Sequence, residues 1–159
     1  MTNPLKYLVR RFALRKFRSA VPQSIIPLDS VKCAAVFVDR GLPGADAAGT
    51  AARNFFESRG IAVLLLRPDE RQLNFAGFMR RKFRIPDGGR HEDLFISLSD
   101  DPENFASEFE ARCSPARFKA GRIRLTGGVF DMIVSPPGDE RADQAAVFGA
   151  ISEYLLKIK

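Results

Sequence analysis

Three charged residues closely follow apolar runs that are predicted to be strands. Asp39 follows residues 32–38, Arg67 follows residues 61–66, and Asp100 lies two positions after residues 93–98. Ligands in open α/β sheets bind at the carboxyl ends of the strands. The sequence therefore makes Asp39, Arg67 and Asp100 candidates for holding a small anionic ligand. The alternative is structural, because every strand must end in a polar loop.

The other motifs that could indicate a catalytic or binding site match the known patterns poorly. The loop after residue 38 contains glycines at 41, 44 and 49, but it matches neither G-x-G-x-x-G nor a P-loop, and Pro43 removes an amide donor. His91 is the single histidine, and no nucleophile is paired with it. Cys33 and Cys113 are far apart and are expected to be buried free thiols in a reducing cytoplasm. We assign no catalytic residue, metal or cofactor.

Clusters of basic residues are the stronger signal. They interleave with phenylalanines, and arginine makes bidentate contacts with phosphate. We therefore predict that the basic residues contact the backbone of structured RNA, as in a ribosome, with no DNA-specific signal. The alternative for the two later clusters is an ordinary solvated surface. The predicted contacts are Lys6, Arg10, Arg11, Arg15, Lys16 and Arg18 in the N-terminal arm, then Arg80, Arg81, Lys82 and Arg84, and finally Arg117, Lys119, Arg122 and Arg124.

The N-terminal arm accounts for the whole net charge. The chain of 159 residues carries a formal charge of +6, and residues 1–28 hold six basic residues and no acid. The other 19 basic residues equal the 19 acidic ones. A charge excess confined to one terminal segment is typical of an interaction tail.

The arm is predicted to be a basic amphipathic helix. Asn3 and Pro4 are favourable residues for starting a helix, and Leu5, Leu8, Val9 and Phe12 form one apolar stripe. An isolated helix of this length is marginal in water, so we expect it to become ordered on its partner. An anionic membrane surface, an organellar transit function and docking of the stripe on the protein's own body are the alternatives. No run is long enough to span a bilayer.

The body alternates predicted strands and helices. This order predicts a three-layer α/β sandwich, Rossmann-like or flavodoxin-like, with a mostly parallel sheet. We expect a helical arm over residues 1–19, a linker over 20–30 and one α/β domain over 31–159. Strands are predicted at 32–38, 61–66, 93–98, 117–120 and 129–134, and helices at 45–59, from 101 to about 113, and at 139–157.

Several segments resemble an uncharacterised bacterial family of short proteins with no assigned activity. They are residues 5–11 (LKYLVRR), 93–98 (DLFISL), 113–121 (CSPARFKAG) and 129–134 (VFDMIV). The resemblance implies a bacterial cytoplasmic protein. The piece 116–121 (ARFKAG) is also similar to sugar-nucleotide transferases, an analogy at the level of the fold. We predict a non-catalytic, ribosome-associated RNA-binding protein. The alternatives are a peripheral membrane protein and a small-ligand or nucleotide-sugar enzyme acting at the strand ends.

Overall fold

Five parallel strands form the central sheet of the computed structural model, which describes residues 3–85, 89–135 and 142–159. Their order is β2-β1-β3-β4-β5, the flavodoxin-like order. Both points confirm the predicted fold class. The strands are β1 (Cys33–Phe37), β2 (Ala62–Leu66), β3 (Leu94–Ser97), β4 (Phe118–Gly121) and β5 (Met132–Ile133).

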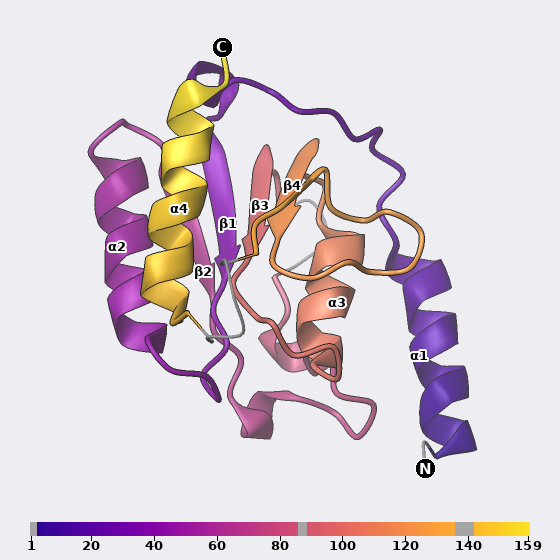
Figure 1. The fold of residues 1–159 in the computed structure, drawn as a ribbon. Helices are drawn as coiled ribbons and strands as arrows, with labels where there is room; N and C mark the ends of the chain where they lie inside the picture. Colours follow the sequence, from indigo (N-terminus) through magenta and orange to yellow (C-terminus); the bar gives the residue numbers. More distant parts are fainter. Residues whose placement is uncertain (1–2, 86–88, 136–141) are drawn as a thin grey trace.

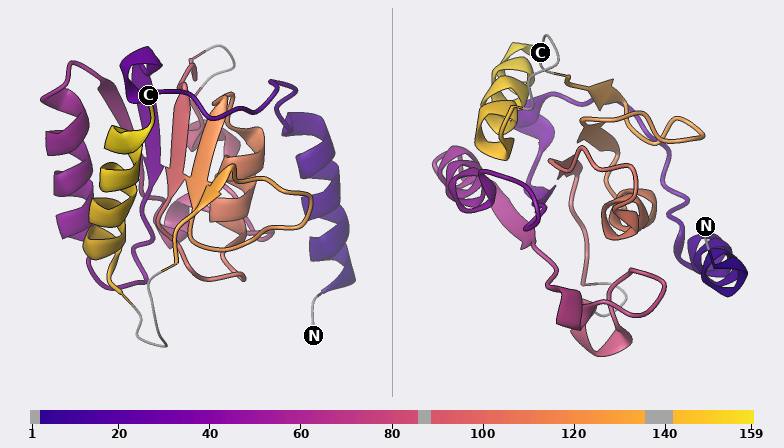
Figure 2. Two further views of the ribbon diagram at one scale, coloured as in Figure 1. Left: turned by 45° about the horizontal axis from the view of Figure 1, so that its top comes forward. Right: turned by 60° about the horizontal axis from the view of Figure 1, so that its bottom comes forward.

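The helices complete a layered sandwich. Helices α2 and α4 cover one face of the sheet, and α3 covers the other (Figures 1 and 2). Helix α1 lies beyond α3, at the side of the molecule away from α2 and α4 (Figure 1). The bounds are α1 (Pro4–Phe17), α2 (Ala45–Glu57), α3 (Phe105–Cys113) and α4 (Gln144–Lys157), with short 3₁₀ turns at Leu28–Ser30, Glu70–Gln72 and Arg81–Phe83.

The apolar runs are continuous because the central strands are buried on both faces. In β1, Val36 belongs to the core beneath α2 and α4, while Phe37 belongs to the core beneath α3. Val36 is paired with Leu65 of β2 on one side and with Ile96 of β3 on the other. A parallel strand covered by two layers of helices has no face on which polar residues could alternate.

Two predicted helix starts are wrong by a few residues. Asp101 does not cap α3, because it closes a turn in which its side chain accepts a hydrogen bond from the Glu103 amide at 2.9 Å. Asn104 caps α3 instead, accepting from the Ser107 amide. Helix α4 begins at Gln144 with Asp143 as its cap, and the earlier part of the predicted helix, residues 139–141, lies outside the described residues.

The chain between α1 and β1 runs along the body. The Ser19 amide donates to the Arg112 carbonyl at 3.1 Å, and the Ser24 amide donates to the Arg117 carbonyl at 2.7 Å. These bonds attach the predicted linker to the end of α3 and the start of β4. Helix α1 is therefore held at its carboxyl end.

Candidate functional site

Helix α1 packs on the body of the protein and is ordered in this structure without a partner. Ala13 is 3% exposed and lies against a cluster that contains Phe78 and Phe105. The ring of Phe17 meets that of Phe109 edge to face, with centroids 6.1 Å apart. The expectation that the arm becomes ordered only on its partner is wrong for this structure, because α1 buries apolar side chains against its own chain.

Arg10 belongs to this internal contact. Its Nε donates to the Ala76 carbonyl at 2.6 Å, and its guanidinium carbon lies 4.4 Å from the centroid of the Phe105 ring. The predicted role of Arg10 as a phosphate ligand does not fit this position, since its Nε and the face of its guanidinium already have partners. Arg10 fixes the rotation of α1 on the body.

The predicted apolar stripe faces away from the body. Leu5, Leu8 and Phe12 are 60%, 61% and 67% exposed. At about 100° per residue they lie on the side of α1 opposite to Arg10 and Phe17. The alternative in which the stripe docks on the protein's own body is therefore not what the structure has, apart from the half-buried Val9.

Basic side chains border this exposed stripe on both sides. By helical geometry, Lys16 lies one turn beyond Phe12 on one side, while Arg11 and Arg15 lie on the other side, one turn from Leu8 and Phe12 respectively. All three basic residues are exposed. We call Leu5, Leu8 and Phe12 with Arg11, Arg15 and Lys16 the amphipathic stripe. It is an apolar strip about two turns long, with Arg11 and Arg15 along one margin and Lys16 beside its carboxyl end.

The remaining predicted phosphate ligands divide into exposed and enclosed residues. Arg84 is half-buried, and its guanidinium carbon lies 4.7 Å from the centroid of Phe17 and 5.1 Å from that of Phe78. Lys6 is half-buried on α1. The exposed members are Arg18, Arg80, Arg81, Lys82, Arg117 and Arg124.

Lys119 and Arg122 are buried, so the prediction that they contact phosphates is wrong. The Nζ of Lys119 donates to the Ala111 carbonyl at 2.7 Å, and burial lowers the pKa of this amine to about 8. The Nη1 of Arg122 donates to the Leu98 carbonyl at 3.0 Å, and its Nη2 lies 3.5 Å from a carboxylate oxygen of Asp100. Both side chains donate hydrogen bonds to backbone carbonyls inside the fold and are not available to a phosphate.

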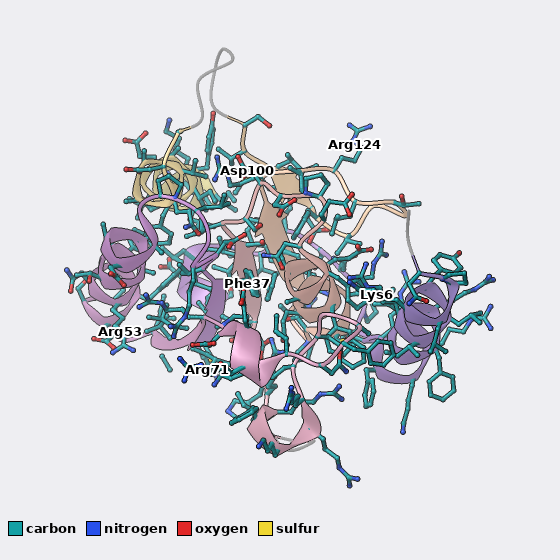
Figure 3. The ribbon with its side chains drawn as sticks, turned by 90° about the horizontal axis from the view of Figure 1, so that it is seen from below. Lys6, Phe37, Arg53, Arg71, Asp100 and Arg124 are labelled. Atoms are coloured by element: carbon teal, nitrogen blue, oxygen red, sulfur yellow. The ribbon has the colours of Figure 1, made fainter. Side chains whose placement is uncertain are left out.

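The predicted ligand residues at the strand ends do not come together. Asp39 does line a cleft of about 570 Å³ at the carboxyl ends of β1 and β3, where the strand order reverses. Arg67 instead pairs with Asp46 on α2, and Asp100 pairs with Arg122. Viewed along the strands, Phe37 lies centrally, with Asp100 and Arg71 on opposite sides of it (Figure 3). Of the three predicted ligand residues, only Asp39 therefore borders this cleft, while Arg67 and Asp100 have partners elsewhere.

The cleft does not favour an anion. Asp39, Asp69, Glu70 and Asp101 border it, against Arg40 and Arg71. The carboxylate of Asp39 is also saturated, since it accepts from the Ser99 hydroxyl at 2.8 Å, the Asn104 amide group at 2.8 Å and the Gly41 backbone amide at 2.9 Å. This arrangement fixes the loop after β1 against the start of α3.

The remaining chemistry-bearing residues are dispersed. His91 is exposed, and the two cysteines are free and half-buried. Burial raises the pKa of the Cys113 thiol to about 12, so this thiol is a poor nucleophile at neutral pH. Within residues 3–85, 89–135 and 142–159, no group of three or more His, Cys, Asp or Glu side chains could hold a metal ion.

Sequence reasoning missed a buried ionic network beside α3. Arg90 is paired with both Glu92 and Glu110, and the Ser114 hydroxyl donates to Glu92 at 2.9 Å. Glu92 has a side chain that is 1% exposed. Arg90 and Glu92 share one segment, but Glu110 and Ser114 lie about twenty residues further along the chain, so no local pattern in the sequence could have indicated the whole network.

No family model, curated protein or solved structure matches the chain. In the part of the chain that the structure describes, none of the helices combines the length and the apolar character needed to cross a bilayer. The candidate site with the most specific geometry is the amphipathic stripe.

Proposed function

We propose that this protein attaches peripherally to anionic membrane surfaces through the amphipathic stripe of α1. One observation carries the proposal: three large apolar side chains, Leu5, Leu8 and Phe12, are solvent-exposed and flanked by the exposed basic residues Arg11, Arg15 and Lys16. Helices of this design lie in the plane of the lipid headgroups with their apolar side inserted.

The free energies of apolar insertion and of charge attraction together are large enough for reversible attachment to an anionic membrane. Complete burial of one Leu or Phe side chain contributes about 1.5–3 kcal/mol, so partial insertion of three gives roughly 3–5 kcal/mol. Each Lys or Arg near an anionic leaflet contributes about 1 kcal/mol. Arg11, Arg15 and Lys16 therefore bring the total into the range of reversible attachment.

The stripe fits a membrane better than it fits RNA. Phosphates of RNA would pair with the basic margins, but Leu5 and Leu8 would gain nothing from them. Four of the fourteen predicted phosphate ligands, Arg10, Arg84, Lys119 and Arg122, are also engaged inside the protein. A second copy of the chain fits less well, because the basic margins of the two copies would repel each other.

Vesicle flotation tests the proposal with the full chain. We expect the protein to float with vesicles that contain phosphatidylglycerol and not with vesicles of phosphatidylcholine alone. The triple variant Leu5→Ser/Leu8→Ser/Phe12→Ser should lose at least tenfold in affinity. The matched control Ile25→Ser/Phe75→Ser/Leu156→Ser replaces three other exposed apolar side chains and should float like the native protein.

The basic margins are tested separately. Arg11→Gln/Arg15→Gln/Lys16→Gln should weaken binding to anionic vesicles and remove its dependence on salt. Arg53→Gln/Arg71→Gln/Arg124→Gln removes the same charge from exposed positions away from α1 and should have a small effect (Figure 3). Failure to float, with salt-dependent retention of ribosomal RNA that survives the triple serine variant, would overturn the proposal in favour of RNA binding.

A further inference from the structure

A second hollow lies beneath the carboxyl end of α1 and is separate from the cleft at the strand ends. It has a volume of about 260 Å³. Its apolar walls come mainly from α1, β2, the β2–β3 connection and α3, and they include Phe17, Leu66, Met79, Ile85, Phe109 and Cys113. A site of this volume accommodates roughly eight or nine carbon-sized groups, taking the ~30 Å³ of one water as the unit.

One cation at this cavity has only aromatic and backbone partners among the described residues. The Nε of Arg84 donates to the Met79 carbonyl at 2.8 Å. Its guanidinium group lies over the rings of Phe17, Phe78 and Phe109 at 4.7–5.4 Å. No described carboxylate lies within ion-pair distance of Arg84.

The other ionic groups at the cavity are already paired. Arg90 bonds both Glu110 and Glu92 through its two terminal nitrogens, while its Nε is buried without a described partner. Glu110 borders the cavity, and burial raises the pKa of its carboxyl group. Arg84 is therefore the cation that an incoming anionic group would reach with the least competition.

We infer that this cavity binds a medium-chain fatty acid, with the aliphatic chain against Phe17, Leu66 and Phe109 and the carboxylate on Arg84. Apolar walls with one convergent charged group are the usual composition of a small-molecule site. A carboxylate pairs well with a guanidinium because the bond is charge-assisted and can be bidentate. The inference does not depend on attachment to membranes.

Titration calorimetry with octanoate and with 1-octanol measures the inferred selectivity. We expect octanoate to bind the native chain at least tenfold more tightly than 1-octanol. Arg84→Met retains the aliphatic part of the side chain and should bring the two affinities to within threefold of each other. Arg81→Met changes an exposed arginine of the same segment and should retain the native preference.

Two further variants keep the result interpretable. Asp87→Asn removes a carboxylate close in sequence to Arg84, and it should leave the preference for octanoate intact. The triple serine variant of the amphipathic stripe should bind octanoate like the native chain, so failure of the membrane proposal and failure of this one are distinguishable. No octanoate binding, or equal binding of octanoate and octanol by the native chain, would overturn the inference.

Discussion

The side-chain amide of Gln144 is hydrogen-bonded to both backbone groups of Asp39. Its Nε2 donates to the Asp39 carbonyl at 2.8 Å, and its Oε1 accepts from the Asp39 amide at 2.8 Å. Gln144 is fully buried at the first turn of α4, and its Nε2 also lies 3.2 Å from the Leu42 carbonyl. One side chain thus replaces the strand partner that Asp39 loses where β1 ends.

Gln144→Ala should lower the free energy of unfolding by about 2–3 kcal/mol, because several buried backbone groups lose their partner. Gln144→Glu should cost more, since a carboxylate cannot donate to the Asp39 carbonyl and its charge would be buried. Urea denaturation followed by circular dichroism measures both. Asn54→Ala, at an exposed position on α2, is the control and should change stability little.

A charge placed on the packed side of α1 should detach this helix. Ala13→Asp buries a carboxylate against Phe78 and Phe105, whereas Phe12→Asp places the same charge one residue earlier on the exposed side. We expect Ala13→Asp to accelerate tryptic cleavage at Arg15 and Lys16 at least tenfold while the body remains folded. Equal cleavage rates in the two variants would contradict the docking of α1.

Lys119 should make the free energy of unfolding depend on pH between about 8, the pKa of this amine in the folded protein, and its ordinary pKa of 10.5. Because burial lowers the pKa of this amine, the unfolded chain binds more protons in that interval, and stability rises with pH. The effect is about 3 kcal/mol at most over the whole interval. Below pH 8 the full cost of the buried charge is present.

The measurement is urea denaturation of the native chain and of Lys119→Met at pH 8 and pH 10. The native chain should gain stability relative to the variant as the pH rises. The Cys113 thiol, whose pKa is raised to about 12, titrates in the opposite sense and is electrostatically coupled to Lys119. The same comparison made in a Cys113→Ala background removes this contribution and isolates Lys119. A constant difference between the two proteins would show that Lys119 is not buried as a charge.

Several elements were predictable because their sequence signals are local. Continuous apolar runs mark β1 and β3, and Asn3 with Pro4 marks the start of α1, whose cap accepts from the Leu5 amide at 3.0 Å. The start of α3 was wrongly predicted at Asp101 for a local reason too, because a turn and a helix cap favour the same kind of side chain.

The docking side of α1 was not predictable, because the helix carries apolar side chains on two sides and only one of them packs. Leu5, Leu8 and Phe12 dominate the pattern, yet Ala13 is small enough for close approach and Arg10 is satisfied by the Ala76 carbonyl. Lys119 and Arg122 were misassigned for a related reason. Their partners, the carbonyls of Ala111 and Leu98, come from other elements of the fold.

The direction of α1 has a consequence for orientation. The helix runs alongside the strands rather than across them (Figures 1 and 2). If α1 lies flat in a headgroup layer with the amphipathic stripe downward, the strands also run parallel to that layer. The cleft beside Asp39, at the ends of the strands, then opens parallel to the membrane surface and is not covered by lipid. Dissolved molecules could therefore enter this cleft while the protein stays attached.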